Sequence, residues 1–190
     1  KKQCHNDGTM DIHEQLTVLD LGGTNNKLEL VDQLERIAIE HGYKTVDRND
    51  TKPWGAYLRF DSEAAERFIA SFFPGLSLAE AQLGIENAEL SPKFLLVAPH
   101  QRLSWQKHDR RAERWAFLTD GAYYKSPTDE QGEVVTVAAG DVVQFERGER
   151  HRLVGLPDSY ALVAEIWQHS DPHDLSDEDD IIRIQDDYSR

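Results

Sequence analysis

The sequence is poor in cysteine and has no long apolar run, and both shortages exclude classes of protein. Its one cysteine, Cys4, lies in a polar leader, which excludes an internal disulfide framework and fits a reducing compartment. No run approaches the roughly 20 apolar residues that a membrane span needs. The leader also lacks the apolar core of a secretory signal. We therefore expect a cytoplasmic protein that has no membrane partner.

Positive charge is also scarce overall, but it is concentrated in two segments. The 21 lysines and arginines are outnumbered by 35 acidic residues, which gives a net charge of −14. This excess repels nucleic-acid phosphates, so we expect no nucleic-acid partner. Eight of the basic residues nevertheless fall within residues 102–114 and 147–152. This concentration indicates either the solvated side chains of a hairpin or a binding site for a small anion.

Helical patterns are confined to the first half of the chain. A length of 190 residues with 39% apolar residues predicts one globular domain that can bury a core. Asn26 and Ser77 are typical N-cap residues, each followed three positions later by a glutamate. The predicted helices cover residues 26–42, 62–73 and 77–84. Residues 1–24 are polar and have no sustained period, so we expect an arm that is partly ordered at best.

The rest of the chain is typical of short antiparallel strands, rich in β-branched and aromatic residues and separated by turn residues. We therefore predict a mainly β fold, a sandwich or barrel. The predicted strands are residues 55–60, 93–99, 102–108, 113–118, 133–140, 141–146, 151–155, 160–167 and 181–184. The predicted organisation is an arm and helix (1–50), a main domain (51–190), a helical insertion (about 61–90) and a tail (about 171–190). Within the tail we expect the acidic run 177–180 to stay solvated and Tyr188 to dock on the β domain.

One predicted hairpin carries three side chains that could bind a metal. Gln106 and His108 alternate along a strand and so share a face, and a turn returns Glu113 beside them. His151, which follows a glycine turn, offers a fourth ligand. This mixed nitrogen and oxygen set suits one divalent ion, Zn foremost, with Ni, Fe, Co and Mn as rivals. The competing interpretation is that both histidines are ordinary surface or hydrogen-bonded sheet residues.

The same segments resemble the paired motifs of the cupin superfamily, and within it the phosphomannose isomerases. The likeness is carried by "KPWGAY", "KFLLVAPHQRLSWQKHDRRAERW", "GDVVQFERGERHRL" and "DEDDIIRIQDDYSR". It implies a jelly-roll barrel with the N-terminal helices packed outside, and a metal held by Gln106, His108, Glu113 and His151. Three positions depart from the pattern: His100 replaces a glycine, Glu146 a proline and Arg110 a histidine. These departures concern the substrate more than the metal.

The resemblance implies isomerisation of a phosphosugar, aldose to ketose, through a cis-enediolate. Proton transfer needs a base near the reacting carbon, and the candidates are Lys93 and His100. Guanidinium groups bind phosphate oxygens bidentately. The candidates for the phosphate site are Arg111 and Arg102, followed by Arg110 and Arg152.

Two other functions fit the same motifs. One is a non-catalytic protein that binds a sugar or a nucleotide sugar, since one fold serves unrelated functions. The other is an iron centre that performs dioxygenation, although such a centre prefers more histidines. Among isomerases the substrate stays open between mannose 6-phosphate, a heptose phosphate and a free sugar. Relatives of this kind often pair through edge strands, so we expect a homodimer.

Overall fold

Two antiparallel sheets form the body of the protein in a computed structural model that describes residues 10–189. The large sheet has six strands in the order β1-β2-β3-β10-β5-β8, and the small sheet has five in the order β11-β4-β9-β6-β7. The strands of the large sheet are β1 (Thr45–Asn49), β2 (Gly55–Phe60), β3 (Lys93–Val97), β5 (Arg111–Phe117), β8 (Val142–Phe145) and β10 (Ala161–His169). Those of the small sheet are β4 (Trp105–Lys107), β6 (Gly121–Ser126), β7 (Val135–Val137), β9 (Arg150–Val154) and β11 (Ile182–Gln185).

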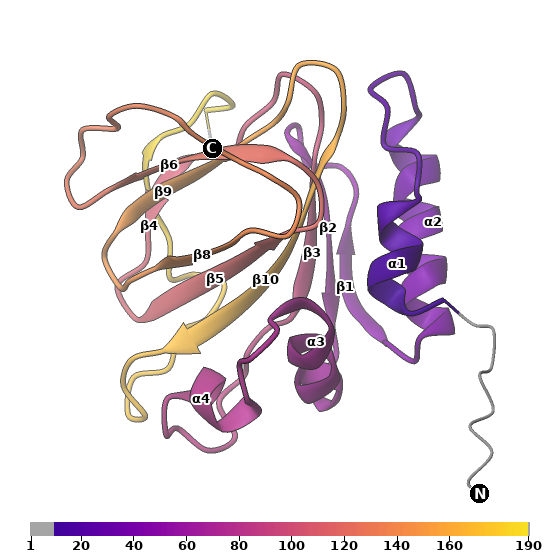
Figure 1. Ribbon diagram of the computed structural model, residues 1–190. Coiled ribbons are helices and arrows are strands. Elements are labelled where there is room, and N and C mark those ends of the chain that lie inside the picture. The colour runs from indigo at the N-terminus through magenta and orange to yellow at the C-terminus, as the bar shows by residue number, and fades with distance from the viewer. Residues whose placement is uncertain (1–9, 190) are drawn as a thin grey trace, which may run out of the picture.

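From β3 onward the chain passes repeatedly from one sheet to the other, so neighbours within a sheet are mostly not consecutive in sequence. This is the connectivity of double-sheet jelly-roll folds. Figure 1 shows the two sheets, with α1 and α2 packed outside them beside β1. The prediction of a mainly β fold with external N-terminal helices is confirmed.

The predicted helices begin where their capping residues stand. The side chain of Asn26 accepts a hydrogen bond from the backbone of Glu29, and Ser77 and Glu80 form a reciprocal capping box. These caps satisfy backbone N–H groups that have no partner inside a helix. The helices are α1 (Ile12–Thr17), α2 (Lys27–Glu40), α3 (Ala65–Phe72), preceded by the 3-10 turn η1 (Ser62–Ala64), and α4 (Leu78–Gln82).

The arm over residues 1–24, expected to be partly ordered at best, contains a helix that was not predicted in the part that the structure describes. Residues 12–17 form α1, in which Ile12 and Leu16 are buried among residues of the other helices. Only six residues long, α1 is too short to show a helical period, and tertiary packing stabilises it. Cys4 and the rest of the arm up to Thr9 lie outside the described residues. Strands β1 and β6 were also absent from the prediction.

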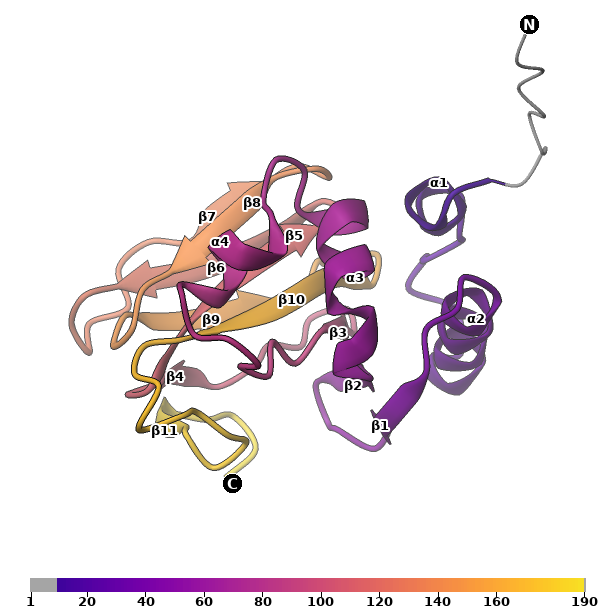
Figure 2. The ribbon, with the colours of Figure 1, turned by 90° about the horizontal axis from the view of Figure 1, so that it is seen from below.

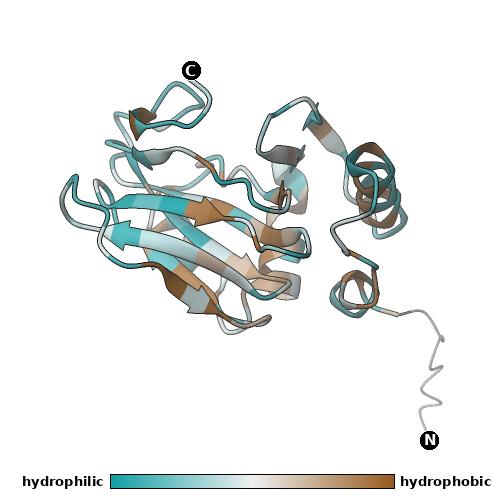
Figure 3. Cartoon of the chain, turned by 90° about the horizontal axis from the view of Figure 1, so that it is seen from above, coloured by the Kyte–Doolittle hydropathy of each residue, from teal (hydrophilic) through white to brown (hydrophobic). Residues whose placement is uncertain are grey.

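The large sheet separates two apolar cores. Phe94 and Leu96 of β3 point to its outer face, where the helices lie, and Leu95 and Val97 point inward between the sheets. This alternation follows from the two-residue period of a strand. Figure 2 shows α3 and α4 lying across the sheet and α1 and α2 beyond its edge. In Figure 3 the apolar residues gather on the strand segments nearest the helices.

Among the described residues, no helix combines the length and the apolar character that crossing a membrane requires.

Candidate metal centre

Three buried side chains converge between the sheets. His108 follows β4, Glu113 lies on β5 and His151 lies on β9. His108 Nε2 is 3.0 Å from one carboxylate oxygen of Glu113, and His151 Nε2 is 3.3 Å from the other. One potential ligand atom from each residue lies within 4.8 Å of the others. Of the four predicted ligands, these three meet closely enough to share one ion.

The tautomers of the two histidines leave room for a cation. Nδ1 of His108 lies 2.6 Å from the carbonyl oxygen of Asp180, and Nδ1 of His151 lies 3.1 Å from that of Glu149. Because carbonyl oxygens only accept, each Nδ1 carries the proton and each Nε2 presents a lone pair. The two Nε2 atoms are 3.2 Å apart. The lone pairs of the two Nε2 atoms repel each other unless a cation or proton lies between them. Metal-binding histidines are oriented in this way.

Electrostatics favour a metal over a shared proton. Burial lowers the pKa of His108, so its imidazole is held neutral, the form that binds metals. Burial alone would raise the pKa of Glu113, but His108 and Arg111 outweigh it and keep that pKa well below the ordinary value. The second carboxylate oxygen of Glu113 is buried and receives no hydrogen bond from any described residue. The donor set therefore fits a divalent cation.

The predicted fourth ligand, Gln106, lies in the same row of the sheet. It stands directly opposite His151 in the pairing of β4 with β9, so the two side chains share a face. Its side-chain oxygen accepts a hydrogen bond of 3.0 Å from the hydroxyl of Ser104. That bond uses one lone pair and leaves another. Coordination by Gln106 stays a prediction.

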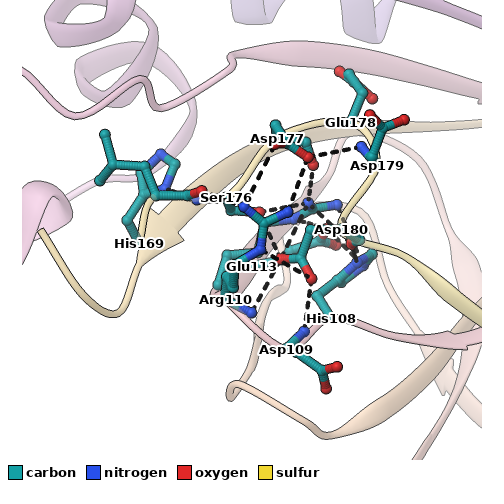
Figure 4. A network of polar contacts seen from close by, with 12 residues as sticks. His108, Asp109, Arg110, Glu113, His169, Ser176, Asp177, Glu178, Asp179 and Asp180 are labelled. Atoms are coloured by element: carbon teal, nitrogen blue, oxygen red, sulfur yellow. Dashed lines mark hydrogen bonds and ion pairs between the residues drawn. The ribbon is translucent and has the colours of Figure 1, made fainter. Parts of the chain in front are cut away.

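The C-terminal tail fixes the turn that carries His108. This turn leads from β4 in the small sheet to β5 in the large sheet, so the two strands do not form the predicted hairpin. The carboxylate of Asp180 accepts hydrogen bonds from the backbone N–H groups of Asp109 and Arg110, at 2.9 and 3.0 Å, and from the hydroxyl of Ser176. Figure 4 shows Asp180 between this turn and its own acidic segment. The prediction that the whole run 177–180 is solvated is therefore wrong, because Asp180 is 6% exposed. In contrast, the predicted docking of Tyr188 agrees with its hydroxyl, which donates to the side-chain oxygen of Gln101.

The four predicted phosphate-binding arginines are all engaged by protein groups. Arg102 pairs with Asp187 at 2.7 Å, and Arg110 pairs with Asp177 at 3.0 Å. The buried Arg152 donates to the backbone oxygens of Leu103 and Gln185 and to the side-chain oxygens of Gln131 and Gln185.

Arg111 is buried as well, and it donates to Glu113 at 3.0 Å and to Ser176 at 2.9 Å. It is the one member of this arginine set that lines the cavity beside the metal centre.

A cavity of about 130 Å³ adjoins the three-residue centre. Its lining combines acids, cations and aromatic rings: Lys52, Trp54, Tyr57, Lys93, Leu95, Leu103, Ser104, Gln106, His108, Arg111, Glu113, Glu165, Glu178, Ile181 and Arg183. Of the two predicted bases, Lys93 lies in this wall. His100 is exposed, has a left-handed backbone conformation with φ 62°, and does not line the cavity.

Glu165 is a cavity residue that the sequence reasoning missed. It lies on β10, 6% exposed, and one of its oxygens accepts a hydrogen bond of 2.8 Å from the indole N–H of Trp115. Lys93 Nζ lies 3.8 Å from its other oxygen. Burial, reinforced by the charge of Glu113, raises the pKa of Glu165 to about 8. A glutamate in the middle of the apolar run "YALVAEIW" was the available signal, since an acid is rarely buried without a reason.

Comparison with known proteins yields similarity of structure alone. No profile of a known protein family matches the sequence, and none of the curated proteins matches it. The capsular polysaccharide assembling protein CapF of Staphylococcus aureus is similar over 73% of this chain and 34% of its own, with 12% identity and a TM-score of 0.48. This chain therefore spans about a third of CapF.

Two further solved structures cover more of their own chains. A predicted oxalate decarboxylase from Thermotoga maritima shares 16% identity over 68% of this chain and 96% of its own, with a TM-score of 0.45. The DMSP lyase DddQ of Ruegeria pomeroyi shares 11% identity over 92% and 77%, with a TM-score of 0.48. Likenesses this distant transfer no chemistry, so a function has to be built from the side chains of this chain.

Proposed function

We propose that this protein is a metal-dependent isomerase of the cupin type, which interconverts an aldose and a ketose of the sugar-phosphate class. One observation carries the proposal: a His-Glu-His centre and a separate buried acid, Glu165, serve the same small cavity. A metal-binding protein without catalysis needs only the first of these. Aldose–ketose isomerisation needs both, because a carbon-bound proton has to be removed and returned.

The metal would be held by His108, Glu113 and His151, with Gln106 as the proposed fourth ligand. Two imidazoles, one carboxylate and one amide favour zinc or another borderline divalent ion. When bound, such an ion supplies Lewis acidity to substrate oxygens. The chain's own contribution is to orient these ligands: carbonyl oxygens fix both imidazoles, and Arg111 holds the carboxylate of Glu113.

Glu165 is the group best suited to carry the proton. The proton leaves C2 of the aldose and returns to C1, and a hydroxyl proton moves between the oxygens of the same two carbons. A carboxyl group whose pKa lies near neutrality can give and accept a proton at comparable cost. The Trp115 indole holds one oxygen of Glu165, which leaves the other toward Lys93 and the cavity.

Lys93 balances the acids around the cavity. Its ammonium group lies 3.1 Å from Glu178 and 3.8 Å from Glu165, and it stacks 4.2 Å from the centre of the Trp167 ring. We assign it the role of positioning Glu165 and the substrate hydroxyls. The sequence predicted Lys93 as a candidate base. We assign the role of base to Glu165 instead.

The size of the cavity supports a substrate that is only partly enclosed. Sites for small molecules usually measure roughly 300–1,000 Å³, whereas this cavity measures about 130 Å³. It therefore accommodates the two reacting carbons and their oxygens. The rest of the substrate would extend through the mouth toward the tail.

The proposal is tested by metal analysis and isotope incorporation. Metal-replete protein incubated with mannose 6-phosphate, and in parallel with a heptose phosphate, in deuterated water should yield ketose that carries deuterium at C1. His151→Ala should lose the bound metal and turnover together, while the matched variant His173→Ala, at an exposed histidine, should keep both.

Three results would contradict the proposal. The first is turnover by metal-free protein, and the second is full turnover by Glu165→Gln. The third is sugar binding with stoichiometric metal but no deuterium exchange, which would favour the non-catalytic function. Purified protein that contains iron and consumes oxygen would instead favour dioxygenation.

A further inference from the structure

Three cross-strand neighbours lead from the metal centre to the mouth of the cavity. His151 on β9 stands opposite Gln106 on β4, and Gln106 stands opposite Arg183 on β11. Directly opposed residues of antiparallel strands share a sheet face. Adjacent strands lie about 4.8 Å apart, so the backbones of His151 and Arg183 are roughly 10 Å apart across the sheet. Arg183 therefore belongs to the same row as the metal ligands, at its outer end.

Arg183 differs from the other cations of the cavity in its partners. Arg111 is occupied by Glu113, and Lys93 by Glu165 and Glu178. Lys52, the third of these cations, lies over the Tyr57 ring at 6.0 Å. The guanidinium of Arg183 forms no hydrogen bond or ion pair with any residue from 10 to 189, although it lines the cavity and is exposed. Its donors are thus available to a ligand that enters from solvent.

We propose that Arg183 binds the phosphate of a substrate whose other end lies at the His108–Glu113–His151 centre. The inference rests on the proposed function, which it deepens by naming the phosphate-binding residue and the direction in which the substrate lies. A guanidinium presents two parallel N–H donors that match two phosphate oxygens. The separation along the row leaves room for several carbon atoms between the anion and the metal ligands.

This assignment replaces the arginines predicted from the sequence. Arg102, Arg110 and Arg152 do not line the cavity, and each would have to give up contacts within the protein to bind a ligand. The free donors of Arg183 require no such exchange. The surrounding acids Glu165 and Glu178 repel a phosphate, and an unpaired cation at the mouth offsets this repulsion.

Inorganic phosphate is a sufficient probe, and side-chain NMR can locate it. In a ¹H–¹⁵N spectrum of arginine Nε groups, the resonance of Arg183 is assigned as the one that is absent from the spectrum of the Arg183→Lys variant. Titrating metal-loaded protein with phosphate should shift this resonance, and acetate at equal concentration should shift it less because its charge is lower. Calorimetry should give a phosphate affinity about tenfold weaker in Arg183→Ala and about threefold weaker in Arg183→Lys, which keeps the charge but loses the paired donors.

Arg36→Ala, at an exposed arginine on α2, removes the same charge far from the cavity and should change the affinity less than twofold. Three results would overturn the inference: an unmoved Arg183 resonance while phosphate binds elsewhere, equal weakening by Arg36→Ala, or a response to acetate alone. None of these readings requires turnover. An inactive protein with Arg183-dependent phosphate binding would contradict the isomerase proposal only, and isomerase activity without that dependence would contradict this inference only.

Discussion

The two faces of the large sheet carry different chemistry on the same strands. On β10, Leu162, Ala164 and Ile166 point outward to the helices, and Ala161 and Val163 begin an inward row that continues with Glu165 and Trp167. The outer face is apolar over most of its length and becomes polar near α4, where Arg114 and Gln144 contact Gln168. The inner face changes along its length from aromatic residues to charged ones. Burying a charge is unfavourable unless partners compensate it. The buried charges of the inner face, Lys93, Arg111, Glu113 and Glu165, accordingly lie together at the end where the ligand set and the cavity are.

The outer face should be the more sensitive to loss of volume. Phe94 is 1% exposed, and its ring lies 5.0 Å from that of Phe60 and 5.4 Å from that of Phe72, centre to centre. Phe94→Ala should lower the free energy of unfolding by about 3–5 kcal/mol, since it leaves a cavity in a packed core. Urea unfolding measures this loss. Val142→Ala, at a side chain exposed to 44%, is the control and should change stability by less than about 0.5 kcal/mol.

A variant of the tail beside the inner face should affect stability and metal binding together. Asp180→Asn keeps the shape of the side chain but replaces an acceptor of backbone N–H groups by an amide, and should cost about 1–3 kcal/mol. It should also weaken zinc affinity about tenfold, because Asp180 holds the turn that carries His108. Competition with a zinc chelator measures the affinity. Asp179→Asn, at the exposed neighbouring residue, should behave like the wild type. Equal effects of the two variants would contradict the role of Asp180 in holding the turn that carries His108.

Glu165 should make stability depend on pH with a defined sign. Its pKa is raised from 4.5 to about 8 in the folded, metal-free protein. The folded state then holds the proton that the unfolded state releases, so stability falls as pH rises between these values. Glu165→Gln lacks this loss, and its advantage over the wild type should grow by up to roughly 1.4 kcal/mol per pH unit up to about pH 8. Thermal or urea unfolding from pH 5 to 9 measures it.

The matched control for this profile is the exposed Glu130→Gln, which should track the wild type across the whole range. A constant difference between Glu165→Gln and the wild type would mean that the carboxyl group titrates normally. In that case the contrast between the two faces would rest on geometry alone.

The fold was predictable where a pattern acts over short distances. The caps at Asn26 and Ser77, the two-residue alternation of β3 and the glycine turn before His151 are local, and the structure bears them out. The short α1 escaped prediction because its stability comes from contacts of Ile12 and Leu16 with helices farther along the chain. The helix propensity of residues 12–17 does not reflect such long-range contacts.

The candidate site divides in the same way. By itself the sequence determined that His108 and Glu113 lie close together, because only a short turn separates them. The predicted hairpin is wrong, because β4 belongs to the small sheet and β5 to the large one. Only the tertiary structure decided that Glu165, Asp180 and Arg183 join them, since β10 pairs with β5, β11 pairs with β4, and the tail binds the turn between β4 and β5. Pairing between distant strands depends on the whole core, so the local sequence around these three residues does not predict where they lie in the fold.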